Sequence, residues 1–151
     1  MPASPAAHGT GSGRTEPVPI DRAPPASQPE LPRDLLEALV AWRQAWQDGD
    51  TRTYLSMYDP AFRGTHRSAR DWQLERTRRL RERPLRIVLR DVKVRELAAD
   101  RAVIGWVQDY RSARHADTGW KELVWERQAG VWRITGESWR PLDRPGDRPT
   151  F

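Results

Sequence analysis

Hydrophobic and polar residues alternate with two different periods along this chain, and the period changes near residue 85. Between residues 32 and 83, large apolar residues recur every three or four positions, the spacing of one face of an α-helix. From Leu85 onward they recur at every second position, the spacing of a half-buried β-strand. The pattern therefore predicts helices first and strands afterwards, an order that is typical of the α+β class.

Residues that start and stop helices divide the first part of the chain into three. The first helix is predicted from Pro32 to Asp48, because proline suits a first turn and Gly49 a helix end. Asp50 and Ser68 can cap a second, short helix and a third helix that ends near Arg83. The apolar positions expected to face the core are Leu35, Leu36, Leu39, Val40, Trp42 and Trp46, then Tyr54, Leu55, Met57 and Tyr58, then Trp72, Leu74 and Leu80.

Two strands are predicted between Leu85 and Ser112. In the first strand the apolar side chains change face near Asp91, which indicates a β-bulge. The second strand begins at Ala102, after a turn. One of its faces carries Ala102, Ile104, Trp106, Gln108 and Tyr110.

The stretch Gly119–Trp139 predicts a β-hairpin, around which the rest of the chain is organised. A loop of two or four residues places Trp125 opposite Ile134, so that the apolar faces of the two strands meet. A three-residue loop would leave the apolar face without a partner. We therefore expect the even loop.

That register would, if unbroken, place Glu122 opposite Glu137, a like-charge pair that sheets avoid. One extra residue at Thr135-Gly136 turns Glu137 onto the face that carries Lys121. We predict a bulge there and an inward-facing pair of Lys121 and Glu137.

Composition divides the chain into three parts. Residues 1–30 are rich in Pro, Ala, Ser and Gly, and predict a disordered arm or linker. Residues 31–140 predict one folded domain, and residues 141–151 a flexible tail. No apolar run approaches the roughly 20 residues of a membrane span, and the first 30 residues lack the apolar stretch of a signal peptide.

The formal net charge of +5 comes from a chain with 26 basic residues, of which only Lys93 and Lys121 are lysines. Ten arginines lie between Arg63 and Arg90. An anion-binding face is one interpretation of this segment. Because no nucleic-acid motif accompanies the arginines, we interpret them as a solvated helix face, and nucleic acid is not an expected partner.

Side-chain parity brings polar and aromatic residues to the inward side of the predicted sheet, where tyrosines of the second helix can approach them. One interpretation is a pocket for a small molecule. The other is a structural Lys–Glu pair, with hydrogen-bonded Tyr and Gln side chains that fix the register. The candidate pocket residues are Tyr54, Tyr58, Trp106, Gln108, Tyr110, Lys121 and Glu137.

Catalysis would require a general base in this pocket. Asp109 has the wrong parity, and His8, His66 and His115 lie in the arm or in loops. Glu137 is the inward carboxylate, but a neighbouring lysine would lower its pKa and weaken it as a base. No catalytic residue, cofactor or metal site is predicted, since three scattered His and no Cys offer no ligand spacing.

Trp120 and Val124 lie on the opposite, outer face of the hairpin. Exposed there, they would form an apolar patch, and a homodimer through the outer face of the sheet would bury it. One tryptophan that covers a sheet edge would give the same pattern.

Three groups of residues, in this order along the chain, carry a family resemblance: Asp50, Tyr54-Leu55-Ser56-Met57-Tyr58 and Phe62; Trp106, Gln108, Tyr110 and Ser112; and Gly119, Lys121, Leu123, Gly130, Trp132, Ile134 and Glu137. They resemble the nuclear transport factor 2-like (SnoaL-like) cone fold. The branch that is most similar is the domain attached C-terminally to some L,D-transpeptidase-like cell-wall enzymes. The resemblance covers about residues 35–139.

The resemblance implies three helices packed on a curved, four-stranded antiparallel sheet, with a conical pocket between them. It also implies dimerisation through the outer sheet face and a non-catalytic binding or assembly role, accessory to cell-envelope (peptidoglycan) proteins. A small-molecule enzyme of the same fold, isomerase-like or cyclase-like, is one alternative, and docking on an anionic partner is another. The implied setting is the periplasm or cell envelope, with the cytoplasm as the alternative.

Overall fold

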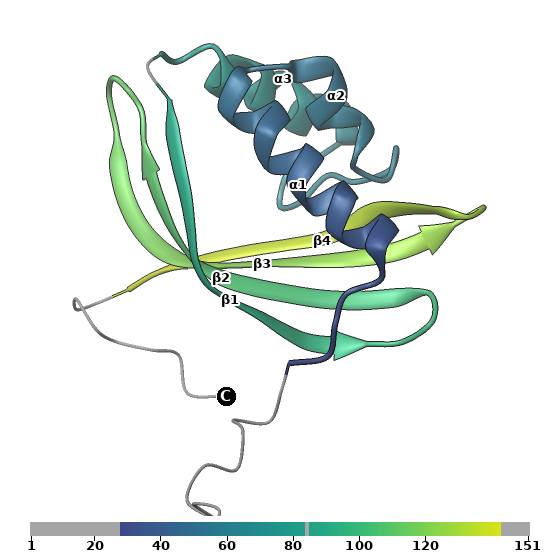
Figure 1. Cartoon of the computed structure of the whole chain (residues 1–151). Helices are drawn as coiled ribbons and strands as arrows, with labels where there is room; N and C mark the ends of the chain where they lie inside the picture. Colours follow the sequence, from purple (N-terminus) through teal and green to yellow (C-terminus); the bar gives the residue numbers. More distant parts are fainter. Residues whose placement is uncertain (1–27, 84, 143–151) are drawn as a thin grey trace, which may run out of the picture.

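The computed structural model describes residues 28–83 and 85–142, which form three helices followed by four strands (Figure 1). The predicted arm (1–30) and tail (141–151) lie almost entirely outside the described residues and stay predictions. The elements are α1 (Arg33–Asp48), α2 (Thr51–Ser56), α3 (Ala69–Leu80), β1 (Arg86–Leu97), β2 (Arg101–Arg111), β3 (Ala116–Gln128) and β4 (Val131–Pro141).

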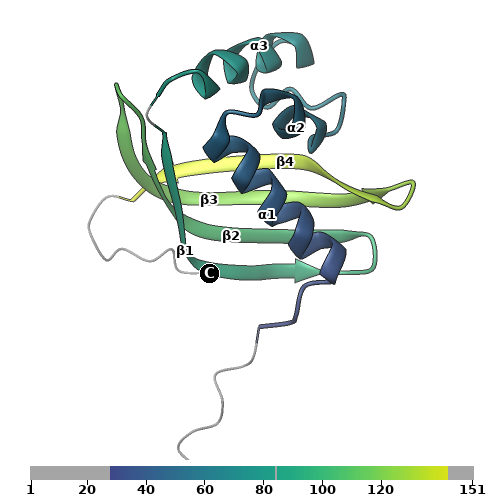
Figure 2. The same cartoon turned by 45° about the horizontal axis from the view of Figure 1, so that its top comes forward.

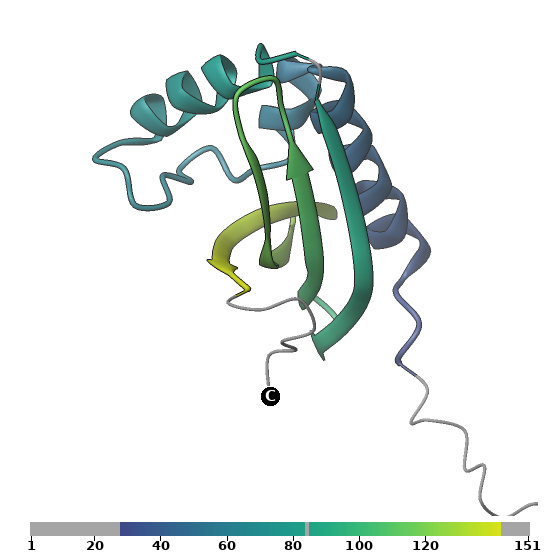
Figure 3. The same cartoon turned by 90° about the vertical axis from the view of Figure 1, so that its left-hand side faces the viewer.

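The strands form one antiparallel sheet in the order β1-β2-β3-β4. The sheet is strongly curved, and all three helices lie on its concave side (Figures 1 and 2). Viewed from the side, the end of the sheet that carries the β2–β3 hairpin bends up toward α3 (Figure 3). The predicted α+β architecture of three helices on a curved, four-stranded sheet is therefore confirmed.

The helix ends follow the predicted capping. Gly49 ends α1 in the left-handed region at φ 69°, and the Asp50 side chain accepts a hydrogen bond from the Thr53 N–H at 3.2 Å. Ser68 caps α3 by accepting from the Asp71 N–H at 3.1 Å. The helix α3 ends at Leu80, earlier than the predicted end near Arg83. Proline at position 84 disfavours a helical conformation in the residue before it, which explains the shorter helix.

The core contains one face of α1, with Leu35, Trp42 and Trp46 buried against the sheet. The predicted apolar stripe was too broad, because Leu36 and Val40 are 48% and 59% exposed. In the same way Leu74 of α3 is 58% exposed. Both helices contact the rest of the domain through a narrow face, so the outer members of each stripe stay in solvent.

Both irregular positions predicted for the strands are present, although Val92 is 44% exposed and β1 has a second, unpredicted register shift between Val94 and Glu96. In β1 the register shifts between Arg90 and Lys93, and Asp91 adopts φ 54°, which confirms the bulge near Asp91. In the β3–β4 hairpin a two-residue loop pairs Gln128 with Val131 and places Trp125 opposite Ile134, as predicted.

The predicted bulge at Thr135-Gly136 is confirmed as well. Val124 pairs with Gly136 and Trp125 with Ile134, which leaves Thr135 as the extra residue. Leu123 therefore lies opposite Glu137, on the concave side of the sheet. The absence of a side chain at Gly136 matters, because a Cβ there would press against the Val124 side chain.

The convex face corrects one premise of the predicted dimer. Trp120 is only 4% exposed within a single chain, because its ring lies over Gly105 of the neighbouring strand β2. Val124 is half-buried. Trp120 thus does not require a second subunit to cover it, and dimerisation through this face stays a prediction.

We expect Gly105→Ala to destabilise the domain, because the new Cβ would overlap the Trp120 ring. Overpacking of this kind costs about 1–3 kcal/mol, and urea melts of the purified protein would measure it. Trp120→Ala in the same chain removes the ring, so the double variant should lose less stability than the sum of the two single changes. Additive losses would contradict the close packing of Trp120 on Gly105.

Candidate functional site

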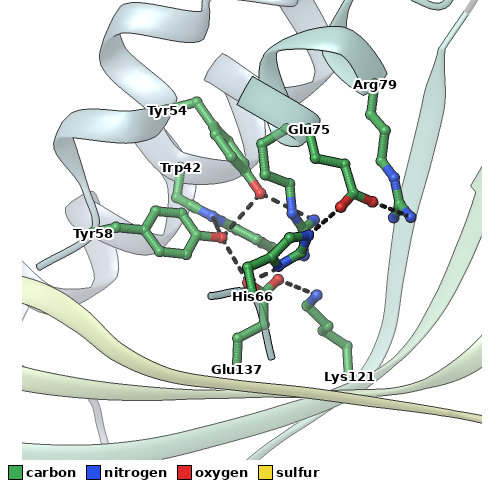
Figure 4. A network of polar contacts seen from close by, with 9 residues as sticks. Trp42, Tyr54, Tyr58, His66, Glu75, Arg79, Lys121 and Glu137 are labelled. Carbon is green, nitrogen blue, oxygen red and sulfur yellow. Dashed lines mark hydrogen bonds and ion pairs between the residues drawn. The ribbon is translucent and has the colours of Figure 1, made fainter. Parts of the chain in front are cut away.

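A buried ionic cluster lies between the helices and the concave face of the sheet (Figure 4). It consists of Lys121 from β3, Glu137 from β4 and Arg76 from α3, with side chains that are 4%, 5% and 19% exposed. Lys121 forms an ion pair with Glu137 Oε1, and Arg76 lies 3.4 Å from Glu137 Oε2. The predicted meeting of Lys121 and Glu137 is therefore confirmed.

Hydrogen bonds from two tyrosines and a tryptophan complete the cluster. The Trp42 indole N–H donates to the Tyr58 hydroxyl at 3.1 Å. Tyr58 donates its own proton to Glu137 Oε2 at 3.2 Å. Because a hydroxyl has a single proton, the 2.9 Å contact between the two tyrosine hydroxyls must be a donation from Tyr54 to Tyr58. The donors thus run in one direction and end on Glu137.

An ionised Glu137 fits this direction, because it accepts the Tyr58 hydrogen bond and forms ion pairs with Arg76 and Lys121. Burial alone would raise the pKa of Glu137, but the charges of Lys121 and Arg76 together with the hydrogen bonds lower it below its usual value. The carboxylate therefore serves as an acceptor that holds its neighbours in place. A lowered pKa makes it a weak general base near neutral pH, as the sequence predicts.

The tyrosines stay neutral. Burial raises the pKa of Tyr54 to about 12, with nearby Arg76 opposing the rise. Burial and the charge of Glu137 raise the pKa of Tyr58 well above its usual value. Burial would lower the pKa of Arg76, but the surrounding tyrosines and Glu137 raise it, so the guanidinium stays charged.

The cluster holds two cations and one carboxylate, so it carries an excess positive charge. Burial lowers the pKa of Lys121, and only the charge of Glu137 and its hydrogen bond counteract this effect. Within the described residues, Glu137 is the one hydrogen-bond or ion-pair partner of the Lys121 ammonium, which also lies 5.8 Å above the Trp46 ring. An ammonium has three N–H donors, so two of them are left for another acceptor.

Lys121 faces a cavity of about 590 Å³. Its walls come from α1, from α3 and the segment that follows it, and from β2, β3 and β4. They bring four cationic side chains, Arg76, Arg78, Arg79 and Lys121, together with two carboxylates, Glu82 and Asp117. Trp46, Tyr110 and Trp139 add aromatic surface. This combination suits a ligand with an anionic group and an apolar part.

A second cavity, of about 500 Å³, is lined by Arg76 and Glu137. The loop that precedes α3 forms one wall, and the bulge of β4 forms another. Phe62, His66 and Trp72 line it as well. Arg76 therefore contributes to both cavities.

The structure separates the predicted pocket residues into two groups. Gln108, Tyr110 and Lys121 line the larger cavity, and Glu137 lines the smaller one. Tyr54, Tyr58 and Trp106 are fully or almost fully buried and line neither. Tyr54 and Tyr58 act on the site through Glu137, and Trp106 packs against Trp42 with ring centres 5.5 Å apart.

Sequence reasoning missed Arg76, which was counted among the arginines of a solvated face. Arg76 follows Trp72 and precedes Leu80 at intervals of four residues, so the three share one face of α3. Since Trp72 and Leu80 are buried, this spacing could have identified Arg76. Trp139 was missed too, although it follows Glu137 by two residues on the same strand face.

Both histidines of the described residues, His66 and His115, are bonded to a carboxylate. His66 is bonded to Glu75, which also pairs with Arg79 at 2.8 Å. The described residues contain no group of three His, Asp or Glu side chains that could hold a metal ion. None of the helices in residues 28–83 and 85–142 is both long and apolar enough to cross a membrane.

Comparison with known proteins gives one family match. The model of the Cds6 C-terminal NTF2-like domain matches residues 34–138, where NTF2 stands for nuclear transport factor 2. No curated protein matches the sequence of this chain. The match agrees with the resemblance that the sequence motifs indicate.

Solved structures show the same fold. Bd1075 of Bdellovibrio bacteriovorus is 23% identical with a TM-score of 0.67, over 74% of this chain and 41% of that one. The helical cell shape determining protein Pgp2 of Campylobacter jejuni is 25% identical with a TM-score of 0.56, over 68% and 39% of the two chains. An NTF2-like protein of Pseudomonas putida is 18% identical with a TM-score of 0.61, over 78% and 91%. This chain thus spans about two fifths of the first two proteins.

The ionic cluster predicts an asymmetric double-mutant cycle. Glu137→Leu leaves Lys121 and Arg76 buried together without their shared carboxylate, so we expect a loss of about 3–5 kcal/mol. Lys121→Met should cost less, because Arg76 and Tyr58 still compensate Glu137. The double variant should recover part of the loss. Urea melts of the four proteins would measure the coupling, and a coupling of zero would show that the two side chains do not meet.

Proposed function

We propose a non-catalytic binding function for this chain, which belongs to the Cds6 C-terminal NTF2-like domain family. NTF2-like domains are often ligand-binding or enzymatic. The function that this site supports is capture of a small ligand through an anionic group, in the cavity that Lys121 faces. The domain would act as an accessory module of cell-envelope proteins, with a fragment of peptidoglycan as the ligand.

The observation that carries the proposal is the Lys121 ammonium. Its side chain is 4% exposed, it shares one carboxylate with Arg76, and two of its N–H donors lie without a partner in the described residues. A buried cation with open N–H donors on a cavity is a preformed donor site for a carboxylate, because charge-assisted hydrogen bonds are strong in a site with little water.

The aromatic walls and the acidic side chains restrict the ligand further. Trp46, Tyr110 and Trp139 offer apolar contact to the part of the ligand that carries no charge. Glu82 and Asp117 on the same cavity suit an amine or a hydroxyl donor. A peptidoglycan fragment combines carboxylates, amides, sugar hydroxyls and, in many forms, a free amine. The structural likeness to a cell shape determining protein supports this ligand class.

The same geometry weakens the two alternatives. An isomerase-like or cyclase-like enzyme needs a base poised near neutral pH, whereas the charges of Lys121 and Arg76 and the hydrogen bonds lower the pKa of Glu137. Docking on an anionic polymer needs a continuous arginine surface. Several arginines of this segment are instead occupied within the domain: Arg76 in the ionic cluster, Arg79 with Glu75, and Arg83 with the Gln47 carbonyl.

We expect a soluble disaccharide–tripeptide muropeptide to bind the protein and Lys121→Met to weaken that binding about 10- to 100-fold. The range corresponds to a charge-assisted hydrogen bond of about 1.5–3 kcal/mol. Isothermal titration calorimetry would give the dissociation constants. Lys93→Met is the matched control, since it removes the same charge from the second lysine of the chain, on β1 away from the cavity.

Two outcomes would overturn the proposal. If the wild-type protein does not bind the muropeptide, the ligand class is wrong. If Lys121→Met binds it as tightly as Lys93→Met does, the cavity that Lys121 faces is not the binding site. A thermal melt of each variant would establish that it is folded at the temperature of the titration.

A further inference from the structure

We propose that the ligand of this site is an extended peptide that carries a carboxylate and adds as a further strand to the open edge of β4. The open edge is defined by the outward backbone groups of Glu137 and Trp139. The inference rests on the proposed function, because the carboxylate of the peptide is the group that Lys121 and Arg76 would bind.

The strand β4 is an edge of the sheet, and its first half is already covered. The Ile134 N–H donates to the Met57 carbonyl at 2.8 Å, and the Ile134 carbonyl accepts from the Asp59 N–H at 2.9 Å. The backbone groups of Ile134 therefore point away from β3, toward the segment that follows α2. That segment occupies this part of the edge.

Beyond the bulge, the outward positions are Glu137 and Trp139. Along β4 the backbone N–H and C=O groups of successive residues point alternately toward β3 and away from it. The extra residue Thr135 shifts this alternation by one, so the next residue after Ile134 whose backbone groups point away from β3 is Glu137. The contacts at the other end of the strand agree. The Leu142 N–H donates to the Thr118 carbonyl at 3.2 Å, so the backbone groups of Leu142 point toward β3. By the same alternation, those of Pro141 and Trp139 point away from β3.

The open edge is short and has defined ends. Pro141 has no N–H, so no donor is available at the next outward position. Within the described residues, the backbone groups of Glu137 and Trp139 make no hydrogen bond on this side. The edge therefore offers two N–H donors and two carbonyl acceptors in the spacing of one strand, which is the arrangement used in β-strand addition.

The opposite edge of the sheet does not offer this arrangement. The register of β1 shifts twice, between Arg90 and Lys93 and between Val94 and Glu96. The Val94 N–H is also bonded to the Gln28 side chain at 2.7 Å. Bulges and local partners of this kind are the usual means by which proteins block an edge. Such a block is found on β1 and on the first half of β4, and it is not found at Glu137 and Trp139.

The surroundings of the open edge define the occupant. Glu137 lines the smaller cavity and Trp139 the larger one, so a strand beside β4 would have one cavity near each end. Arg76, Arg79 and Lys121 line the same cavity as Trp139, which favours a peptide with a carboxylate. A second copy of this chain would bring its own arginines against these, a like-charge approach that disfavours pairing of two β4 strands.

The first test is hydrogen exchange of single amides, measured by NMR on the wild-type protein. The probe is a capped pentapeptide with one glutamate at its centre. We expect it to slow the exchange of the Glu137 and Trp139 amides at least tenfold, while the Ser138 amide, already bonded to β3, changes little. The same peptide, methylated on the backbone nitrogens that face β4, should give no protection. Equal protection by both peptides, or none by the first, would overturn the proposal.

The second test changes the protein. Trp139→Pro removes the outward N–H, and Trp139→Ala removes only the side chain, so both keep the inward ladder to β3. We expect the pentapeptide to bind Trp139→Pro at least tenfold more weakly than Trp139→Ala. Equal dissociation constants for two folded variants would overturn the proposal. If Trp139→Pro does not fold, the comparison of the methylated and unmethylated peptides on the wild-type protein still tests the proposal.

The two proposals fail in different ways. Suppose that Lys121→Met loses muropeptide binding, while Trp139→Pro and Trp139→Ala bind the pentapeptide equally. The proposed binding of an anionic group by Lys121 would then hold, and the proposed added strand would be wrong. Protection of the Glu137 and Trp139 amides that grows with protein concentration, without any peptide, would assign the edge to a second copy of the chain and overturn the proposal.

Discussion

The Glu137 carboxylate is the group on which the interior of this domain depends. Tyr58 after α2, Arg76 of α3 and Lys121 of β3 all reach it from separate parts of the chain. A charge buried this deeply is costly unless several donors compensate it. The helices and the sheet must therefore be in place together before the cluster is stable, so the contacts that form the site also fix the helices over the concave face.

The hairpin could be predicted from the sequence because the side chains of a strand alternate with a strict period of two. That period, together with the avoided pairing of Glu122 and Glu137, was enough to place the bulge at Thr135. Helical stripes carry less information, since apolar spacing shows the direction of a face but not its width. For this reason Leu36, Val40 and Leu74 were expected in the core and lie in solvent.

The remaining errors arose where a residue depends on a partner that the sequence does not pair with it. Trp120 was expected to be covered by a second subunit, because the contact with Gly105 lies on another strand and the register of β2 against β3 had not been assigned. Arg76 was hidden among ten arginines of similar pattern. Its function depends on a carboxylate 61 positions later, at Glu137, which local spacing alone does not reveal.

The bulge at Thr135 makes this site depend on which residues of β4 pair with β3, as well as on their composition. If Thr135 paired with Val124 and the ladder continued unbroken, Glu137 would lie opposite Glu122 and its side chain would turn to the convex face. Lys121 and Arg76 would then lie buried without their shared anion, and the open edge would move to the other parity. Loss of Thr135 alone would instead leave Glu137 opposite Leu123 on the concave side, because only the extra residue of the bulge is removed. The site therefore depends on Thr135 staying out of the ladder and not on its presence.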